Sequence, residues 1–235
     1  MNQSSHVMVY PERSRAIYNK IKSHLKKQSF SGVVQPGTLR TETYLVNGQQ
    51  DYALALKDNA PKLASNAGRE IRLKEQDAFV WTRVRVGVLL EIIAGPVGGE
   101  PTYFYNPLLP FADEVGGFQN AHLSAIWNGQ LFLKVGDTVY LDAFPINKSY
   151  QVGTQQTTAS LKSEQNGEYG WINLTPQYAI KGFDDNDFRA KFPNINANHK
   201  VQWTATNKNV LVVEVEGFKI TGAGTGKLDL QFANE

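Results

Sequence analysis

The sequence predicts an all-β fold, an antiparallel sandwich or barrel, with one basic helix at its N-terminal end. About fifteen short segments have strand patterns and only one segment has a clear helix pattern. Turn signals separate the strands at intervals of about 8 to 12 residues, which is typical of sandwiches and barrels. No repeat of fixed period is present, which argues against a propeller or a solenoid. With 235 residues, 41% of them hydrophobic, the chain can fill a sizeable core.

The first 30 residues are predicted to form a basic helical arm ahead of a sandwich that spans residues 31–235. Pro11 suits the first position of a helix, and Ile17, Ile21 and Leu25 recur every four residues to make one apolar stripe. Residues 1–28 carry +5, which leaves −3 on the rest of a chain of net charge +2. The basic residues of this segment are Arg13, Arg15, Lys20, Lys22, Lys26 and Lys27.

This charge favours contact with an anionic partner, which is nucleic acid, a lipid surface or an acidic face of a neighbouring subunit. The alternative is a helix whose apolar stripe packs on the chain's own body and whose charged back is solvated. The sequence leaves both open. If the chain assembles with neighbouring subunits, deletion of residues 1–28 is expected to disturb that assembly and to leave a folded body.

From residue 38 the pattern changes to strands. Residues 41–46 and 49–56 flank Asn47-Gly48, a pair that predicts a hairpin because both residues tolerate positive φ. Residues 69–73 and 79–94 are the next predicted strands. In the second of these, alternation places Val80, Thr82, Val84, Val86 and Val88 on one face, opposite Trp81, Arg83 and Arg85.

Residues 95–117 are rich in glycine and proline and contain four clustered aromatic side chains. A connection of this length usually serves a purpose, often contact with a partner. The predicted subunit contacts are Tyr103, Phe104, Tyr105 and Phe111.

A three-stranded meander is predicted to follow. Asn128-Gly129 lies between the apolar runs 123–127 and 131–135 and predicts a hairpin, and Gly136-Asp137 predicts a second turn. Residues 139–143 then alternate until Pro145. A short helix capped by its own acids is predicted at 184–192, and further strands are predicted at 169–174, 200–206, 210–215, 218–221 and 228–232.

No motif supports catalysis, a metal or a cofactor. The chain has no cysteine, and its four histidines form no metal-binding pair. Residues 222–226 have the glycines of a phosphate-binding loop but lack its Lys-Ser/Thr ending. Asp184, Asp185 and Asp187 match no EF-hand spacing. We therefore expect a protein that is not an enzyme.

Four tryptophans can in principle stack on sugars, but each lies in a strand pattern, which favours packing inside the protein. They are Trp81, Trp127, Trp171 and Trp203. The longest apolar run, residues 86–94, contains Glu91 and is shorter than the roughly 20 residues of a membrane span. The N-terminus has no signal-sequence pattern. We expect a soluble protein made in the cytoplasm.

Several segments resemble jelly-roll structural proteins of bacteriophages. The similar segments are Arg69-Glu70-Ile71-Arg72-Leu73 followed by Asp77-Ala78-Phe79-Val80, Trp127-Asn128-Gly129-Gln130-Leu131 with Val135-Gly136, and Phe144-Pro145. The fold that the resemblance implies is an antiparallel jelly-roll β-sandwich, either single with insertions or a compact double jelly roll, with an N-terminal basic helical arm.

The resemblance also implies a function. The expected protein is a non-catalytic capsid protein that assembles in the host cytoplasm into an icosahedral phage shell, without a cofactor. Its expected partners are copies of itself and other virion proteins, with nucleic acid or membrane lipid as candidates for the arm. The alternative function is that of a carbohydrate- or receptor-binding β-sandwich module.

Overall fold

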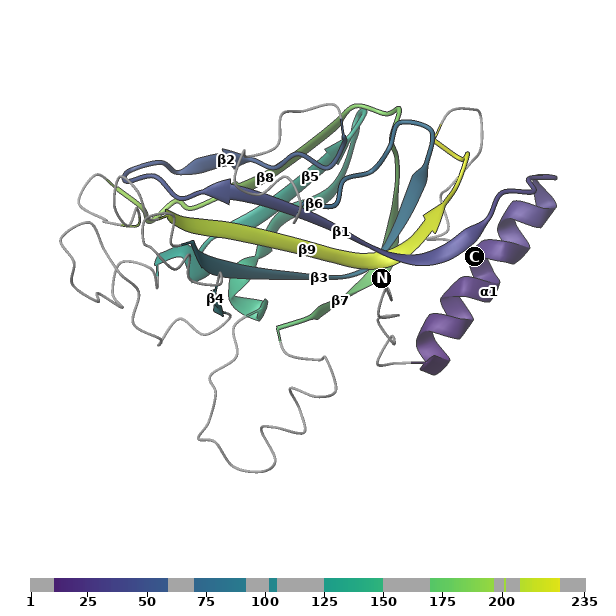
Figure 1. Ribbon diagram of the computed structural model, residues 1–235, viewed down its shortest axis with the longest axis horizontal. Coiled ribbons are helices and arrows are strands. Elements are labelled where there is room, and N and C mark those ends of the chain that lie inside the picture. The colour runs from purple at the N-terminus through teal and green to yellow at the C-terminus, as the bar shows by residue number, and fades with distance from the viewer. Residues whose placement is uncertain are drawn as a thin grey trace, which may run out of the picture.

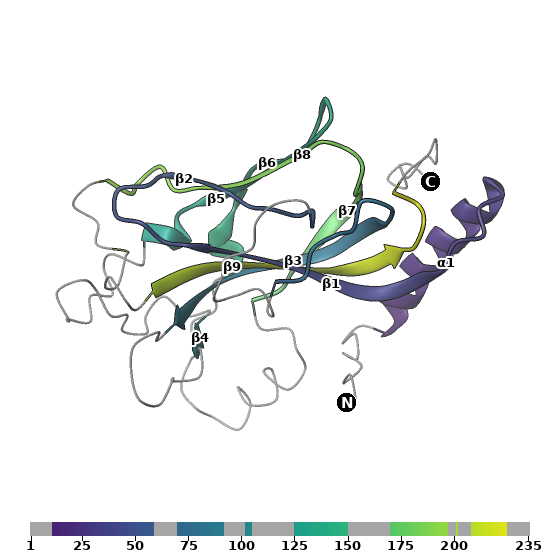
Figure 2. The ribbon, with the colours of Figure 1, turned by 45° about the horizontal axis from the view of Figure 1, so that its top comes forward.

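The computed structural model describes residues 11–58, 70–91, 102–104, 125–149, 170–196, 201 and 208–224. These residues form two antiparallel β-sheets packed face to face, with one α-helix outside them (Figures 1 and 2). The predicted all-β sandwich is therefore confirmed. No helix in this part of the chain is long and apolar enough to cross a membrane.

The first sheet has five strands. Its central path runs β1 (Val34–Tyr44), β9 (Lys208–Ile220), β3 (Ala78–Glu91) and β4 (Thr102–Phe104). The fifth strand, β7 (Ile172–Lys181), pairs with the first half of β3, whereas β4 pairs with its last residues. β7 and β4 therefore follow one another along the same edge of β3.

The second sheet has four strands. Their order is β2 (Asp51–Ala53), β8 (Asn186–Lys191), β5 (Gln130–Val135) and β6 (Thr138–Pro145). A 3-10 helix, η1 (Ile146–Ser149), follows β6, and the α-helix α1 (Pro11–Lys27) precedes β1.

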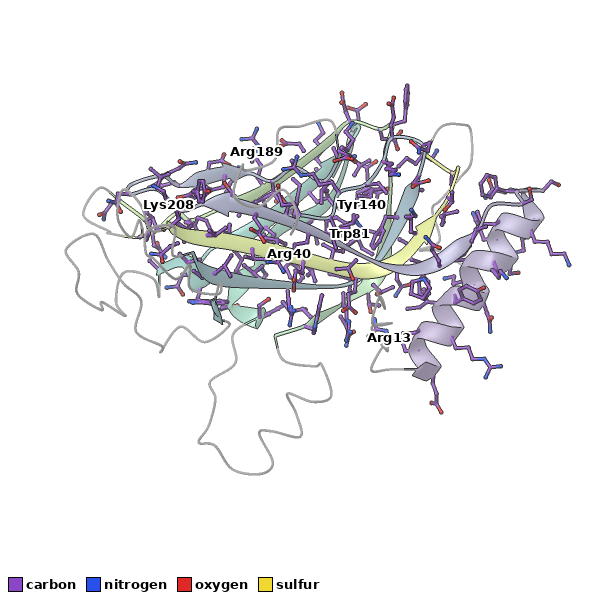
Figure 3. The ribbon with its side chains drawn as sticks, viewed as in Figure 1. Arg13, Arg40, Trp81, Tyr140, Arg189 and Lys208 are labelled. Atoms are coloured by element: carbon purple, nitrogen blue, oxygen red, sulfur yellow. The ribbon has the colours of Figure 1, made fainter. Side chains whose placement is uncertain are left out.

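The main core lies between the two sheets and is lined by alternate residues of their facing sides. Trp81 of β3 meets Phe188 of β8 edge to face, with ring centroids 5.4 Å apart. Leu131 and Leu133 of β5 are fully buried in the same cluster. Trp81 is seen between the layers in Figure 3.

A β-bulge in β3 changes which face its side chains occupy. The pairing of β3 with β7 and with β9 shifts between Trp81 and Arg83, so Thr82 is an extra residue. After the bulge, Val84 points into the main core as predicted, but before it Val80 points to the opposite face, toward α1. The single predicted face of residues 80–88 is therefore wrong at its start, because one inserted residue inverts the alternation.

Asn47-Gly48 does not close a hairpin. Gly48 has φ of 74°, as a turn residue should, but β1 pairs with β9 and β2 pairs with β8. The turn thus joins one sheet to the other. Asn-Gly reports a tight turn, and the partners of the strands that it joins depend on packing elsewhere.

Asn128-Gly129 is not a hairpin turn either. Residues 125–127 are helical, and the amides of Asn128 and Gly129 donate to the carbonyl oxygens of Ala125 and Ile126 at 3.3 and 2.9 Å. The predicted strand at 123–127 is therefore wrong for its described residues. The next turn, at Gly136 with φ of 56°, joins β5 to β6 as predicted.

The predicted helix at 184–192 is wrong, because residues 186–191 form β8. Phe188, Ala190 and Phe192 are buried in alternation, and this period of two overrides the capping signal of the acids. The predicted strands at 210–215 and 218–221 fall in one strand, β9, which ends at Ile220. Residues 202–206 and 228–232 lie outside the described residues.

The strands place their connections at two ends of the sandwich. β1, β3, β6 and β8 finish where β9, β2 and β5 begin, because Tyr44 and Leu89 both pair with Val210 while Gln130 pairs with Lys191 and with Pro145. The turn at Gly48, between β1 and β2, belongs to this end. The turns 74–77, 136–137 and 182–185 belong to the other, which we call the turn end.

Candidate functional site

α1 is docked on the outer face of the first sheet, near the turn end (Figures 1 and 2). Its apolar stripe of Ile17, Ile21 and Leu25 is buried, and Tyr18 lies 5.8 Å from Phe218 between ring centroids. The other members of this second cluster come from the sheet and its C-terminal extension: Val34, Ala78, Val80, Phe218, Ile220 and Ala223. The apolar stripe of the helix therefore packs on the chain's own body, which is one of the two alternatives that the sequence leaves open.

The six predicted anion-contact residues fall into different environments. Arg13 is half-buried and donates to the carbonyl oxygen of Leu174 at 3.1 Å and to Thr175 Oγ1 at 3.4 Å, so it ties α1 to β7 (Figure 3). Lys20 is also half-buried. The remaining four are exposed: Arg15, Lys22, Lys26 and Lys27.

Three of the exposed cations make a straight row that we call the basic stripe: Arg15, Lys22 and Lys26. Their spacings of seven and four residues put them on one side of a helix over about 16 Å. Lys22 Nζ lies 5.1 Å from the ring centroid of Tyr18. Among the described residues, the side chains of Arg15 and Lys26 have no hydrogen bond or ion pair, so they remain available to a partner.

The predicted aromatic contacts are only partly placed. Tyr103 and Phe104 lie in β4, where the backbone of Tyr103 pairs with Leu89 and that of Phe104 pairs with Val88. Tyr105 and Phe111 lie outside the described residues.

The tryptophans do not form an open platform for sugars in the part of the chain that the structure describes. Trp81 and Trp127 are buried at 0% and 3% exposure. Trp171 covers two guanidinium groups, with Arg83 Cζ 4.7 Å and Arg85 Cζ 4.6 Å from its ring centroid. Trp203 lies outside the described residues.

Beyond α1, the outer face of the first sheet carries a network of ion pairs across β1, β9 and β3. Glu214 of β9 binds Arg40 of β1, labelled in Figure 3, at 3.0 Å. It also binds Arg85 of β3 at 2.5 Å. Arg83 binds Glu216 at 2.5 Å, and these partners face each other in the strand register. The side chains are 9–23% exposed. The network therefore holds the three strands together and is not a surface for binding a partner from solution.

A cavity of about 370 Å³ opens at the turn end, and no sequence pattern indicated it. It is formed where three segments distant in sequence meet: residues 57–58, the turn 74–77 and the bend after β7. Phe183 at this cavity is 63% exposed, the largest exposed fraction among the large apolar side chains that the structure describes. The lining residues are Lys57, Asp58, Lys74, Glu75, Gln76, Gly182 and Phe183.

The described part of the glycine-rich segment 222–226 has partners within the chain. The amide of Gly222 donates to Asp77 Oδ1 at 3.1 Å, and the amide of Gly224 donates to the carbonyl oxygen of Gln76 at 2.8 Å. Asp77 also pairs with Lys219 at 3.2 Å. These glycines therefore fasten the end of β9 to the turn 74–77.

Within the described ranges, no group of three or more histidine, aspartate or glutamate side chains is arranged to hold a metal ion. Asp184 uses its carbonyl oxygen to accept a hydrogen bond from Lys57 Nζ at 2.7 Å. Asp187 pairs with Arg189 at 2.8 Å. The carbonyl oxygen of Asp185 accepts from the amide of Gly136 at 2.9 Å, so the three nearby aspartates serve the bend and the outer face of the second sheet.

Comparison of the chain with models of protein families, with curated proteins and with solved structures finds no match.

Proposed function

We propose that the chain is a non-catalytic structural protein of a bacteriophage particle, a capsid protein that assembles with copies of itself into an icosahedral shell. The observation that carries the proposal is the order of strands. Without β4, the eight strands in chain order occupy the positions 1-8-3-6 in one sheet and 2-7-4-5 in the other. This order supports a jelly roll, an architecture that is common in viral capsids. The step from fold to function is one of analogy.

The same strand order favours a single jelly roll over a double one. One such arrangement needs eight strands, and β4 with the connections 92–129 and 146–171 then counts as an insertion into it. The fold class that we propose is therefore a single jelly-roll sandwich with insertions, accompanied by a basic N-terminal helix.

Self-assembly is tested on the purified full-length protein by light scattering and negative-stain electron microscopy. Closed particles or oligomers of one defined size are the expected result. A protein that stays monomeric at high concentration, across a range of salt concentrations and pH values, contradicts the proposal.

The basic stripe is the part of α1 that we propose to meet an anionic partner, either genome, lipid or an acidic face of a neighbouring subunit. Its charges point away from the sheet, whereas the apolar side of the helix is already occupied. Exposed cations of this kind bind polyanions with an affinity that falls as salt rises.

The matching experiment compares two doubly substituted proteins of equal net charge. Arg15→Gln with Lys26→Gln removes two members of the basic stripe, and Lys134→Gln with Lys148→Gln removes two exposed lysines outside it, one in β5 and one in η1. Binding to single-stranded DNA, binding to anionic vesicles and particle formation are measured for each. We expect the first variant alone to lose one of these activities, and equal behaviour of the two variants contradicts a role for the stripe.

A further inference from the structure

The cavity at the turn end is held in shape by hydrogen bonds of its own walls. The amide of Gly182 donates to the carbonyl oxygen of Asp77 at 2.9 Å, and the amide of Asp58 donates to that of Leu73 at 3.0 Å. Lys57 Nζ reaches across to the carbonyl oxygen of Asp184. Gly182 is buried where a Cβ atom would collide with the carbonyl oxygen of Lys74, so the two walls touch there. The cavity is thus formed without a ligand, as small-molecule sites usually are.

Phe183 is a large apolar side chain that this fold leaves in water. It is 63% exposed and belongs to neither of the two large apolar clusters. An exposed phenylalanine beside a cavity offers a flat apolar surface to a ligand. Its neighbours Lys74, Glu75 and Gln76 are also exposed, and none of their side chains has a hydrogen bond within the described residues.

The charges around the cavity balance. Lys57 and Lys74 contribute two positive charges, and Asp58 and Glu75 contribute two negative charges. Two carboxylates disfavour a phosphate or another polyanion, and two ammonium groups disfavour a cation. A purely apolar ligand would remove the exposed side chains of Lys74, Glu75 and Gln76 from water without offering them hydrogen bonds, which is costly. The lining therefore fits a neutral ligand with many hydroxyl groups and one apolar face.

We propose that this cavity binds a neutral carbohydrate. A pyranose ring has an apolar face of C–H groups that matches the ring of Phe183. Its hydroxyl groups both donate and accept hydrogen bonds, so they match the carboxylates of Asp58 and Glu75, the amide of Gln76 and the ammonium group of Lys74. The site uses none of the four tryptophans and does not depend on whether the protein assembles.

The test uses the full-length protein on an array that holds sulfated and sialylated glycans for comparison and, as candidate ligands, immobilised neutral oligosaccharides of hexoses and N-acetylhexosamines. The protein is expected to bind a subset of these glycans, and Phe183→Ala and Gln76→Ala are each expected to weaken that binding by at least about tenfold, which corresponds to about 1.4 kcal/mol. The matched control is Val139→Ala, which truncates another exposed apolar side chain and is expected to leave binding unchanged. Thermal unfolding of each variant checks that the fold is retained.

Two results overturn the proposal: no neutral glycan binds the unsubstituted protein above background, or Phe183→Ala binds as well as the unsubstituted protein. Binding confined to sulfated or sialylated glycans, lost in high salt and retained by Phe183→Ala, also overturns it and assigns the contact to the basic stripe. Each of these results is compatible with normal particle formation, so failure of the carbohydrate site is distinguishable from failure of the capsid proposal.

Discussion

Tyr52 shows how one side chain secures the passage from the first sheet to the second. Its hydroxyl group donates to the carbonyl oxygen of Val46 at 3.1 Å and accepts from the amide of Val46 at 3.0 Å. Its ring is 1% exposed and meets Phe192 edge to face at 5.5 Å between centroids. Tyr52, in β2, thus holds the turn at Gly48 in place.

Tyr52→Phe is expected to lower the free energy of unfolding by about 1 kcal/mol at neutral pH, because the amide of Val46 loses its partner and the carbonyl oxygen of Val46 keeps only the amide of Gln49. Burial raises the pKa of Tyr52 above its usual 10.0, against a smaller lowering by the hydrogen bond with Val46. The folded state therefore holds the phenolic proton more tightly than the unfolded state, and stability falls as pH rises above about 10. Urea titrations between pH 8 and 11 should show a shallower fall for Tyr52→Phe. An identical slope for both proteins would contradict this assignment.

Loss of the buried carboxylate of Glu214 is expected to lower the free energy of unfolding far more than loss of an exposed carboxylate in a similar ion pair. Glu214→Ala leaves Arg40 and Arg85 largely buried without this carboxylate and should cost about 3 kcal/mol. Asp187→Ala removes a partner of Arg189 where the side chains are 41% and 54% exposed, and it should cost less than about 1 kcal/mol. Chemical denaturation measures both. Equal losses of stability in the two variants would show that the ion pairs on the first sheet contribute no more than exposed surface pairs.

At the scale of the element, α1 depends on a cluster separate from the main core. Ile21 is 1% exposed and belongs to the cluster shared with Val80 and Phe218, whereas Trp81 and Leu133 belong to the core between the sheets. β3 contributes to both clusters because alternation turns Val80 toward α1 and Trp81 toward the core, and the bulge at Thr82 then turns Val84 to the core as well. The helix can therefore loosen without disruption of the sandwich.

Ile21→Ala should weaken the docking of α1 by about 2 to 3 kcal/mol through the cavity that it leaves. Hydrogen exchange should then accelerate by roughly 30- to 150-fold at the helix amides, while the amides of β3 and β9 keep their protection. Arg15→Ala, an exposed position of the same helix, serves as the control and should change neither. Equal acceleration in β3 would mean that helix and sandwich unfold as one unit.

At the scale of the whole molecule, removal of the helix should do more than free a surface. Deletion of residues 1–28 uncovers Val34, Val80, Phe218 and Ile220 on the outer face of the first sheet. A patch of this kind promotes association. The shortened protein should keep its strand signal in far-ultraviolet circular dichroism and should bind more of a fluorescent apolar dye than the full chain. Unchanged dye binding would contradict the packing of α1.

The sequence predicts where the strands of this molecule lie better than it predicts which strands pair with one another. Alternation identifies β3, β5 and β9 because each has one side in the core. The strand β6 is also found where it was predicted, but of its alternating apolar residues only Leu141 is buried, and Val139 is 56% exposed. Asn47-Gly48 and Asn128-Gly129 mislead because turn residues specify local conformation, while strand partners are chosen by packing between distant segments.

The candidate sites divide in the same way. The basic stripe follows from helical spacing alone, so Arg15, Lys22 and Lys26 are recognisable in advance. The cavity is not, because Asp58, Gln76 and Phe183 come from three connections with no shared pattern. Only the hydrogen bonds among those connections bring their side chains together.

The docking of α1 has a thermodynamic consequence for any anionic partner. Arg15, Lys22 and Lys26 are held on a helix that is already folded and packed, so binding does not require a disordered segment to become ordered. The entropy of that ordering is spent when the protein folds, and the row of charges is pre-organised. Calorimetric titrations at several temperatures should accordingly give a small change in heat capacity, as in rigid-body association. Coupled folding and binding would give a large negative one.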